Sequence, residues 1–450
     1  MLPSVLQKYG EARVPRYTSY PPSPEFSPSV GLDAYAGWLS HLPRDVPASL
    51  YVHIPFCRSM CWYCGCHTTI TARDQPIADY LDLLHREIGM VAAQAPQSLQ
   101  VDKVHFGGGT PTIVAPADFV ALTDLLRDRF AFTGTAEIAI EIDPRTLTIE
   151  MAGAIGGAGA RRASLGVQSF DPAVQKAVNR IQSEETTLEA VDRLRLSGVS
   201  GINFDLIYGL PYQTVRSCIE TVRAAVAMRP DRLAVFGYAH VPSFKKHQRV
   251  IEEAALPDSV ARMEQALAIA ETLIAAGYVQ IGLDHFALPD DDLARAQAAG
   301  KLRRNFQGYT TDDCETLIGF GASAIGRTRQ GYVQNQVGLG FYASSIASGQ
   351  LATARGYRLT ADDRLRAEII ERLMCDFEVD VPAVCARHGY DPAGLLAGNG
   401  KLSELAEDGV VDVAGGVVRV RHDRRFLVRT AAAAFDAYLH RSPRSHSQAA

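Results

Sequence analysis

The 450-residue chain lacks any apolar run long enough to cross a membrane. A spanning helix needs about 18 or more consecutive apolar residues, and every apolar stretch here is shorter. The first residues also lack a basic stretch followed by an apolar one, so no secretory signal is predicted. We therefore expect a cytoplasmic protein without a membrane span.

Positive charge is not in excess either. Lys and Arg number 45 against 50 Asp and Glu, which gives a formal net charge of −5. Nucleic-acid-binding proteins neutralise phosphates with surplus Lys and Arg, so we expect no nucleic-acid partner. The 47% hydrophobic and 21% charged content is ordinary for globular proteins. The length exceeds the roughly 250–300 residues at which one core stops growing, so more than one domain is predicted.

Cysteines are few, and their spacing is not that of a disulfide framework. Of the eight, four crowd between Cys57 and Cys66. Clustered thiols in a large chain without a signal indicate metal binding or catalysis in a reducing compartment. The other four stand singly and are predicted to be small buried hydrophobic residues: Cys218, Cys314, Cys375 and Cys385.

From Ser49 the chain alternates short apolar runs with helix-length amphipathic segments. The predicted strands are Leu50–Ile54, Val104–Phe106, Ile138–Ile142, Ala163–Val167, Ile202–Ile207 and Leu233–Phe236. The predicted helices between them lie near Tyr80–Ala93, Ala117–Phe130, Thr187–Leu196 and Val215–Met228. Such alternation predicts an α/β fold with a parallel sheet. Six strands suit a partial (β/α)6 TIM-like barrel and fall short of the eight in a closed one.

The pattern changes on both sides of this core. Residues 1–48, rich in Pro, Tyr and Ser, predict an extended N-terminal arm, and 49–256 form the barrel core. Residues 257–359, with a long helix near Val260–Ala276, are interpreted as a barrel extension that covers the substrate. Residues 360–440 predict a mostly helical C-terminal domain with a hairpin wing at Gly409–Val420, and 441–450 a disordered tail. No basic recognition helix stands beside the wing, which favours a structural role over DNA binding.

The cysteine loop directly follows the first predicted strand. Cys57, Cys61 and Cys64 form a CxxxCxxC triplet, and thiolates select iron–sulfur clusters, zinc or copper(I). Structural zinc normally takes four ligands, and no second CxxC occurs. Three ligands leave one iron of a [4Fe–4S] cluster open, which favours catalysis. Cys66 is an alternative fourth ligand, but its closeness to Cys64 would strain the chain. His67 is an alternative zinc ligand, but a loop position near the site is favoured.

A CxxxCxxC triplet on the loop after the first barrel strand resembles the radical S-adenosylmethionine (SAM) superfamily. The resemblance implies a barrel of the radical SAM type and a [4Fe–4S] cluster whose open iron binds the methionyl group. An electron from the cluster then splits the cofactor, and the resulting 5′-deoxyadenosyl radical abstracts a hydrogen atom. The protein orients cofactor against substrate and excludes competing reactions.

Further motifs resemble one family, the oxygen-independent coproporphyrinogen III oxidases, over nearly the whole chain. They are PRYTSYP (15–21), YVHIPFC (51–57), CGC (64–66), GGGTPT (107–112), EIDPR (141–145), GVQSF (166–170), DLIYGLP (205–211), FGYAHVP (236–242), DHFALPDD (284–291), RNFQGYTT (304–311) and YVQNQ (332–336). The resemblance implies that coproporphyrinogen III loses two propionate carboxyl groups and becomes protoporphyrinogen IX. It further implies two SAM molecules, an unidentified electron donor and acceptor, and a monomer.

The resemblance also implies the cofactor contacts. Gly108, Gly109 and Thr110 would meet the methionine amino group, although a tight strand-to-helix turn would also need glycine there. Glu141 would bind the ribose hydroxyls. The remaining contacts with one or other SAM molecule would be Tyr51, Tyr63, Gln168, Arg180, Asp205, Ala239 and Ile325. Arg180 reads equally well as a solvated charge, and Ala239 and Ile325 as hydrophobic lining.

Three residues are candidates for roles near the substrate. His53 lies on an apolar strand, where a core histidine is the commoner case, but its nearness to Cys57 suggests support of the site. Cys66 is placed near the substrate or second cofactor. Arg304 opens the RNFQGYTT block and is the best candidate for a propionate, because the guanidinium fork binds carboxylates bidentately. The other cationic candidates are Arg16, Arg303, Lys245 and Lys246.

Three other readings remain open at this point. A haem chaperone of a sister family would keep the cluster motif without decarboxylation. A haem-degrading radical methyltransferase would give a methylated tetrapyrrole. An electron carrier would not bind SAM, and the GGGTPT and Glu141 positions would then have no ligand.

Overall fold

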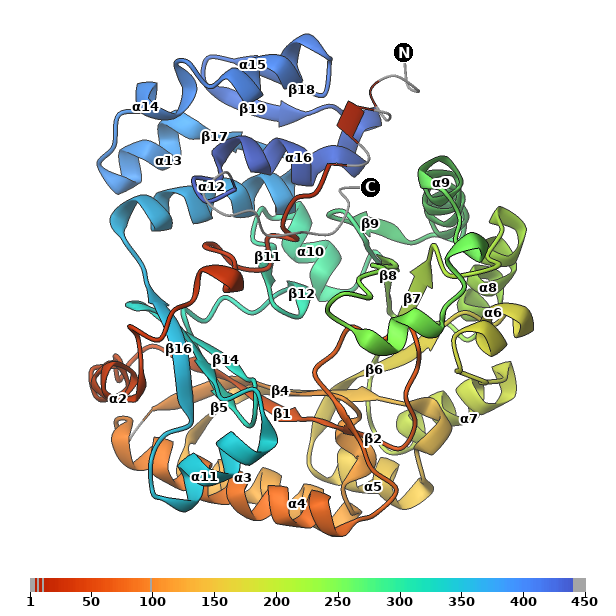
Figure 1. The fold of residues 1–450 in the computed structure, drawn as a ribbon, viewed down its shortest axis with the longest axis vertical. Helices are drawn as coiled ribbons and strands as arrows, with labels where there is room; N and C mark the ends of the chain where they lie inside the picture. The colour runs from red at the N-terminus through yellow and green to blue at the C-terminus, as the bar shows by residue number, and fades with distance from the viewer. Residues whose placement is uncertain (1–4, 6–7, 10–11, 98, 440–450) are drawn as a thin grey trace.

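The computed structural model describes residues 5, 8–9, 12–97 and 99–439, and a 12-stranded sheet forms its centre (Figure 1). Six neighbouring strands run parallel in chain order: β1 (Ala48–Ile54), β4 (Gln100–Gly108), β5 (Ala131–Ile142), β6 (Ala160–Gln168), β7 (Gly201–Tyr208) and β8 (Arg232–Gly237). These are the six predicted strands, so the α/β class and the sixfold alternation are confirmed.

The sheet stays open because further strands extend both edges. Beside β1 lies β13 (Thr316–Phe320), which runs parallel, followed by the antiparallel strands β14 (Ile325–Thr328), β15 (Gly331–Asn335) and β16 (Thr353–Arg358). Beyond β8 lie antiparallel β10 (His285–Ala287) and β9 (Val279–Ile281). Part of the segment after residue 257 thus belongs to the same sheet as the barrel core. The strand order does not test the domain boundaries predicted at residues 48, 256, 359 and 440, which remain predictions.

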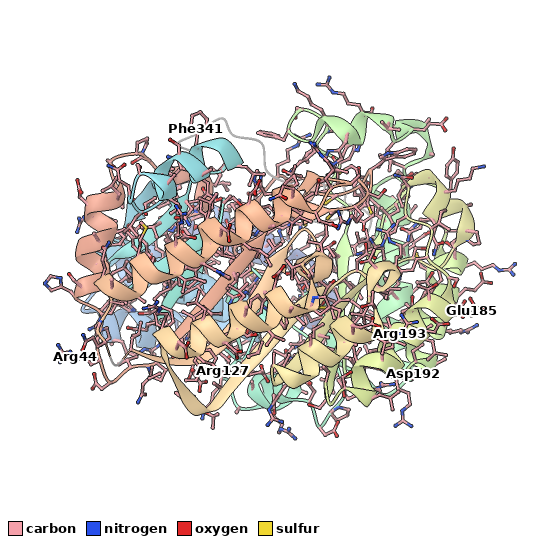
Figure 2. All side chains as sticks on the ribbon, turned by 90° about the horizontal axis from the view of Figure 1, so that it is seen from below. Arg44, Arg127, Glu185, Asp192, Arg193 and Phe341 are labelled. Atoms are coloured by element: carbon pink, nitrogen blue, oxygen red, sulfur yellow. The ribbon has the colours of Figure 1, made fainter. Side chains whose placement is uncertain are left out.

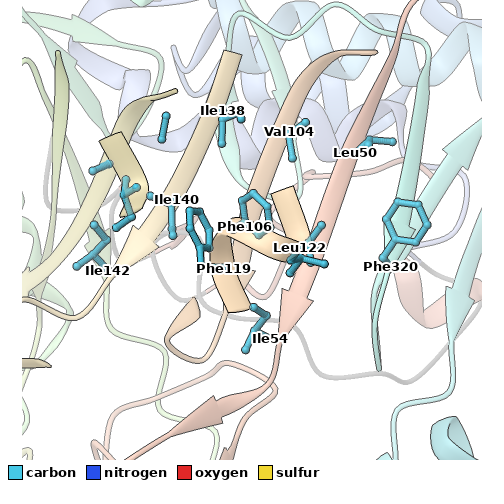
Figure 3. Packing of buried hydrophobic residues seen from close by; sticks show 14 of the residues in the cluster. Leu50, Ile54, Val104, Phe106, Phe119, Leu122, Ile138, Ile140, Ile142 and Phe320 are labelled. Atoms are coloured by element: carbon cyan, nitrogen blue, oxygen red, sulfur yellow. The ribbon is translucent and has the colours of Figure 1, made fainter. Parts of the chain in front are cut away.

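Helices cover the outer face of the sheet, and Figure 2 shows α3 (Gln75–Gln94), α4 (Pro116–Arg129) and α5 (Ile149–Gly157) across it. Exposed charged side chains such as Glu185 and Asp192 point away from the sheet. The series continues with α6 (Pro172–Ala177), α7 (Glu184–Leu196), α8 (Val215–Ala227) and α9 (Ser259–Ala275). Beneath them Phe106 and Phe119 pack edge to face, with ring centroids 5.1 Å apart (Figure 3). Burial of each such ring contributes about 1.5–3 kcal/mol, which fixes the sheet as a platform for its loops.

The predicted extended arm is wrong in one part, because residues Leu32–Ser40 form helix α2. Its apolar side chains Tyr35, Trp38 and Leu39 follow helical spacing and are buried. The earlier part of the arm crosses from the C-terminal region to the barrel (Figure 1). Tyr17 donates a hydrogen bond to Asp436 Oδ2 at 3.0 Å, so the arm and the end of the chain share one core.

The C-terminal region is mostly helical, as predicted. It comprises α12 (Ala361–Asp376), β17 (Glu378–Asp380), α13 (Val381–His388), α14 (Ala393–Leu396), α15 (Gly400–Glu407), β18 (Val411–Ala414), β19 (Val417–Val420) and α16 (Val428–Ala432). The hairpin β18–β19 gains a third strand, β17. Short elements complete the chain: β2 (Phe56–Cys57), β3 (Thr69–Ile70), α10 (Asp292–Ala298), β11 (Arg303–Asn305), β12 (Gly308–Thr310) and α11 (Leu339–Ala347).

Residues 441–450, predicted to be a disordered tail, lie outside the described residues. Across the part of the chain that the structure describes, no helix combines the length and apolar character that a bilayer crossing needs.

Candidate active site

The cysteine loop lies at the carboxyl end of β1 and opens into a cavity of about 740 Å³. Cys57, Cys61, Cys64 and Cys66 all line this cavity, which we call the thiol cavity. All four are free thiols. The carboxyl ends of parallel strands are where barrel enzymes place their active sites, so the loop stands in the expected position.

Two hydroxyl groups hold the first thiol. Thr68 Oγ1 lies 3.3 Å and Thr110 Oγ1 3.4 Å from Cys57 Sγ. Burial raises the pKa of Cys57, and these hydrogen bonds lower it, with a net rise. At the other end of the loop, a hydrogen bond from Cys66 lowers the pKa of Cys64 to about 6 and raises that of Cys66. The loop is therefore fixed by side chains on both sides of the triplet.

Two arginines face the middle thiol. Arg180 Nη1 lies 3.5 Å and Arg145 Nη2 3.7 Å from Cys61 Sγ. Both arginines pair with Asp143: Arg145 Nη2 at 2.6 Å and Arg180 Nη2 at 3.3 Å from its carboxylate oxygens. Arg180 is buried and also donates to the Gly166 carbonyl, so it is not a solvated surface charge. Positive charge beside a thiol favours its thiolate form.

Sequence reasoning missed Asp143 and Arg145 as site residues. Both belong to the EIDPR segment, which was noted for its resemblance alone. The signal that could have identified them is their position directly after β5, at the same sheet edge as the cysteine loop.

The glycine segment after β4 approaches the cysteine loop so closely that side chains cannot fit. A Cβ atom on Gly109 would lie 2.5 Å from the Phe56 carbonyl oxygen and from Thr68 Oγ1. Gly108 has φ +126°, and a Cβ there would meet the Ile54 carbonyl oxygen at 2.8 Å. Glycine is therefore required at both positions by contact with the cysteine loop.

Two carboxylates stand on the next strands. Glu141 accepts from the backbone N–H of Gly108 at 3.1 Å and lies 3.2 Å from His105 Nε2. Burial alone would raise the pKa of Glu141, but these partners lower it overall, so it is ionised. Asp205 accepts from Ser164 Oγ and Asn203 Nδ2, each at 2.9 Å. Burial is the largest effect there and raises the pKa of Asp205 to about 6.

Most predicted site residues line the thiol cavity: the three triplet cysteines, Cys66, Tyr63, Gly108, Gly109, Thr110, Glu141, Gln168, Arg180, Asp205 and Ala239. Gln168 has φ 68°, a left-handed backbone that costs a residue with a side chain of order 1 kcal/mol. Strain of this kind concentrates at functional sites.

Tyr51 and His53 lie behind the cavity lining. Tyr51 OH lies 2.9 Å from His53 Nδ1, and His53 Nε2 lies 3.1 Å from the His67 carbonyl oxygen. The carbonyl can only accept, so Nε2 carries the proton and Nδ1 accepts from Tyr51. Burial is the largest effect on His53 and lowers its pKa to about 4, so the ring is neutral at pH 7. His53 therefore connects β1 to the loop after the cysteines.

Two further predicted site residues also lie outside the thiol cavity. Ile325 begins β14 and is absent from the described residues that line it. Arg304 lies in an adjoining cavity, on β11. Other residues of the RNFQGYTT block line the thiol cavity, so the block borders both cavities: Phe306, Gln307, Tyr309, Thr310 and Thr311.

A single structural metal ion such as zinc would need about four ligands around one point. Among the described residues, no group of three or more His, Cys, Asp or Glu side chains stands close enough to hold one ion. A four-iron cluster is larger than an ion and takes its three thiolates from different sides. Three free thiols around one cavity, with two arginines to balance negative charge, fit such a cluster.

Comparison with known proteins covers nearly the full chain. Residues 51–225 match the radical SAM superfamily and residues 359–421 the HemN C-terminal domain. The oxygen-independent coproporphyrinogen III oxidase of Bradyrhizobium diazoefficiens is 59% identical over 441 residues, 98% of each chain. That of Escherichia coli is 40% identical over 98% of this chain and 96% of the relative. The solved structure of coproporphyrinogen III oxidase (HemN) from Escherichia coli, described as a radical SAM enzyme, matches with a TM-score of 0.90 at 40% identity, covering 94% of this chain and 98% of that one.

Proposed function

The chain belongs to the family of oxygen-independent coproporphyrinogen III oxidases, and we propose from this how its residues carry out that reaction. It is an oxidoreductase of the radical SAM type that acts in anaerobic haem biosynthesis. It removes the carboxyl group and one hydrogen from each of two propionates of coproporphyrinogen III, leaving vinyl groups and giving protoporphyrinogen IX. The observation that carries this proposal is the meeting of three thiols, the glycine segment and two carboxylates in one cavity.

Cys57, Cys61 and Cys64 would hold the [4Fe–4S] cluster. When bound, the cluster and SAM supply the radical that removes a hydrogen atom from the propionate. The guanidinium groups of Arg145 and Arg180, both within 3.7 Å of Cys61 Sγ, stabilise the thiolate needed as a ligand. Thr68 and Thr110 do the same for Cys57 by hydrogen bonds.

Other groups at the same edge would bind the first SAM molecule. Gly108, Gly109 and Thr110 line the cavity next to the cysteine loop, where a methionyl group would lie. The ionised Glu141 accepts hydrogen bonds, which suits ribose hydroxyls, and Asp205 lies on the same wall.

The remaining predicted contacts divide by position. Gln168, Arg180, Tyr63 and Ala239 line the cavity and are proposed to contact one of two SAM molecules. Tyr51 and Ile325 are proposed as contacts at the margin of the site. His53 is proposed to position the loop after the cysteines, since it is neutral and hydrogen-bonded on both ring nitrogens.

Cys66 is proposed to act near the substrate or the second cofactor, since it lines the cavity beside Cys64. The electron donor and final acceptor are separate molecules of unidentified kind. We further propose that the enzyme is a monomer and works in the cytoplasm, where clustered free thiols stay reduced.

An anaerobic assay tests the proposed reaction. The enzyme is reconstituted with iron and sulfide, then given dithionite, SAM and coproporphyrinogen III, and tetrapyrroles are followed by mass spectrometry. We expect two successive losses of CO₂ plus two hydrogens, with matching 5′-deoxyadenosine. Cys64→Ser should abolish both products, whereas Cys385→Ser, on α13 in the C-terminal region, should not.

Other outcomes would assign a different function. Cofactor cleavage with unchanged porphyrinogen and haem binding would indicate a haem chaperone. A methylated tetrapyrrole would indicate a methyltransferase. Failure of the reconstituted protein to bind SAM would indicate an electron carrier and would contradict the proposed roles of Gly108, Gly109 and Glu141.

A further inference from the structure

A second cavity of about 700 Å³ adjoins the thiol cavity. The two share a wall that includes Gly237, Tyr238, Ala239 and Phe306. Each volume lies within the roughly 300–1,000 Å³ typical of ligand sites. A large ligand that extends past these shared residues could therefore contact the linings of both cavities.

Six arginines line the second cavity, which we call the arginine cavity. They come from four separate parts of the chain: the N-terminal arm, α9, β11 and the C-terminal region. The six are Arg13, Arg16, Arg262, Arg304, Arg425 and Arg429. Three acidic residues share the lining, so positive charge exceeds negative there although the whole chain is acidic.

The three acids offset this positive charge only in part, through a long ion pair between Asp284 and Arg304. Asp423 pairs with Arg424 at 2.9 Å. Asp284 lies 2.7 Å from His285 Nδ1, and its nearest arginine contact is a 3.9 Å approach by Arg304 Nη1, too long for a hydrogen bond. Glu271 is exposed on α9.

Three arginines of this cavity have donors without partners among the described residues: Arg262, Arg304 and Arg425. The Arg304 side chain is 4% exposed, lies over the Tyr309 ring at 4.4 Å, and has no hydrogen-bond partner on Nε or Nη1. Arg262 Nε is likewise buried without a partner, and its guanidinium lies 5.6 Å from the Tyr208 ring centroid. A buried donor without a partner destabilises the protein, and a bound acceptor would recover that loss.

The arginines also influence one another. Arg429 donates to the carbonyls of Val14 and Pro15 on the arm. Burial, followed by the charges of Arg16 and Arg304, lowers the pKa of Arg429 to about 10. An anion placed among these groups would remove that repulsion.

We propose that Arg16, Arg262 and Arg304 bind the carboxylates of the propionate groups that are not reacting. The reacting propionate then extends past the shared wall into the thiol cavity. This inference rests on the proposed function for the identity of the substrate. It assigns the arginine cavity to substrate anchoring, and it explains how an acidic protein attracts a tetracarboxylate.

The planar guanidinium group can bind a carboxylate through two parallel hydrogen bonds, which the ammonium group of Lys cannot do. Arg262 is the most informative position, because its side chain forms no ion pair with the described residues and has an unused donor. Arg16 is exposed at the cavity rim and donates only a long 3.4 Å bond to the Gly237 carbonyl. Substitution there should leave folding intact.

The test compares reconstituted wild type with Arg262→Gln, Arg262→Lys and Arg16→Gln. Arg216→Gln, an exposed change on α8 away from both cavities, is the matched control. We expect each glutamine variant to raise the KM for coproporphyrinogen III about tenfold or more, since a charge-assisted bond is lost. The KM for SAM and the iron content should stay at wild-type values, and Arg262→Lys should recover part of the loss.

Direct binding separates this inference from the proposed function. Coproporphyrin III, the oxidised tetracarboxylate, is titrated into each holoenzyme and followed by its fluorescence. Weaker binding by both glutamine variants supports the inference. Unchanged binding and unchanged KM in both folded variants would overturn it while leaving the decarboxylation assay valid. A wild type that binds the porphyrin through these arginines but forms no vinyl product would contradict the proposed function alone.

Discussion

Replacing Glu87 with glutamine should remove a pH dependence of stability that this buried carboxyl group imposes. Glu87, on α3, is 2% exposed. It accepts from Gly321 N at 2.6 Å, Asn335 Nδ2 at 2.6 Å and Tyr342 OH at 2.8 Å. Burial is the largest effect and raises its pKa to about 7 from an ordinary 4.5, although the three donors oppose the rise.

The sign and size follow from these two pKa values. Between pH 4.5 and pH 7 the folded chain keeps the proton that the unfolded chain has released, so stability falls as the pH rises through this window. At about 1.4 kcal/mol per pH unit, the loss amounts to about 3 kcal/mol. Below the window both states are protonated and above it both are ionised, so the contribution is constant on either side.

Glutamine removes the titration but introduces a poor contact. Its amide nitrogen would face one of the three donors, at a cost of about 1–3 kcal/mol that does not depend on pH. Urea unfolding at pH 5, 6, 7 and 8 measures both effects. Glu184→Gln makes the same change at an exposed position on α7 and should keep the wild-type slope. If Glu87→Gln and wild type lose equal stability between pH 5 and pH 7, the reasoning is refuted.

Three further outcomes are expected at the site itself. Serine at Cys57, Cys61 or Cys64 should abolish the broad visible absorption of the reconstituted cluster, as read by anaerobic spectroscopy, with circular dichroism unchanged. Gly109→Ala should weaken SAM binding at least about tenfold in equilibrium dialysis, because its Cβ would force the Phe56 carbonyl and Thr68 apart; equal affinity would contradict the close approach. Since the pKa of Asp205 is raised to about 6, mainly by burial, wild-type affinity for SAM should fall as the pH drops below 6, whereas Asp205→Asn should show a flat profile.

The strand order was predictable because buried parallel strands carry continuous apolar runs. The predicted bounds were too short where strands extend into solvent. Strand β5 begins at Ala131, before the predicted Ile138, because residues 131–137 are exposed or half-buried and carry no apolar signal. Helix α2 was missed because prolines around it favoured an extended reading, although Tyr35, Trp38 and Leu39 follow helical spacing.

The site was predictable where its residues are close in sequence. The cysteine triplet and the glycine segment are local patterns, and parallel strands bring their loops to one edge. The approach of Arg180 to Cys61 and the grouping of Arg262 with Arg304 depend on tertiary packing of distant segments. Arg180 and Arg304 were proposed from the family resemblance and its motifs, whereas nothing local distinguished Arg262 from the solvated surface arginines that are more common.

The shared core of the arm and the C-terminal region sets the order in which the enzyme can be completed during synthesis. Tyr17 and its hydrogen-bond partner Asp436 are 419 positions apart. At roughly 5–20 residues per second, the partner is made on the order of 20–80 s after the tyrosine. Arg16 can therefore take its place in the arginine cavity only when translation is nearly complete, whereas the barrel has time to fold before then. A chain that stalls early can form the cysteine loop, but it cannot finish the arginine cavity, so an incomplete enzyme would have little means of holding a substrate near an exposed radical centre.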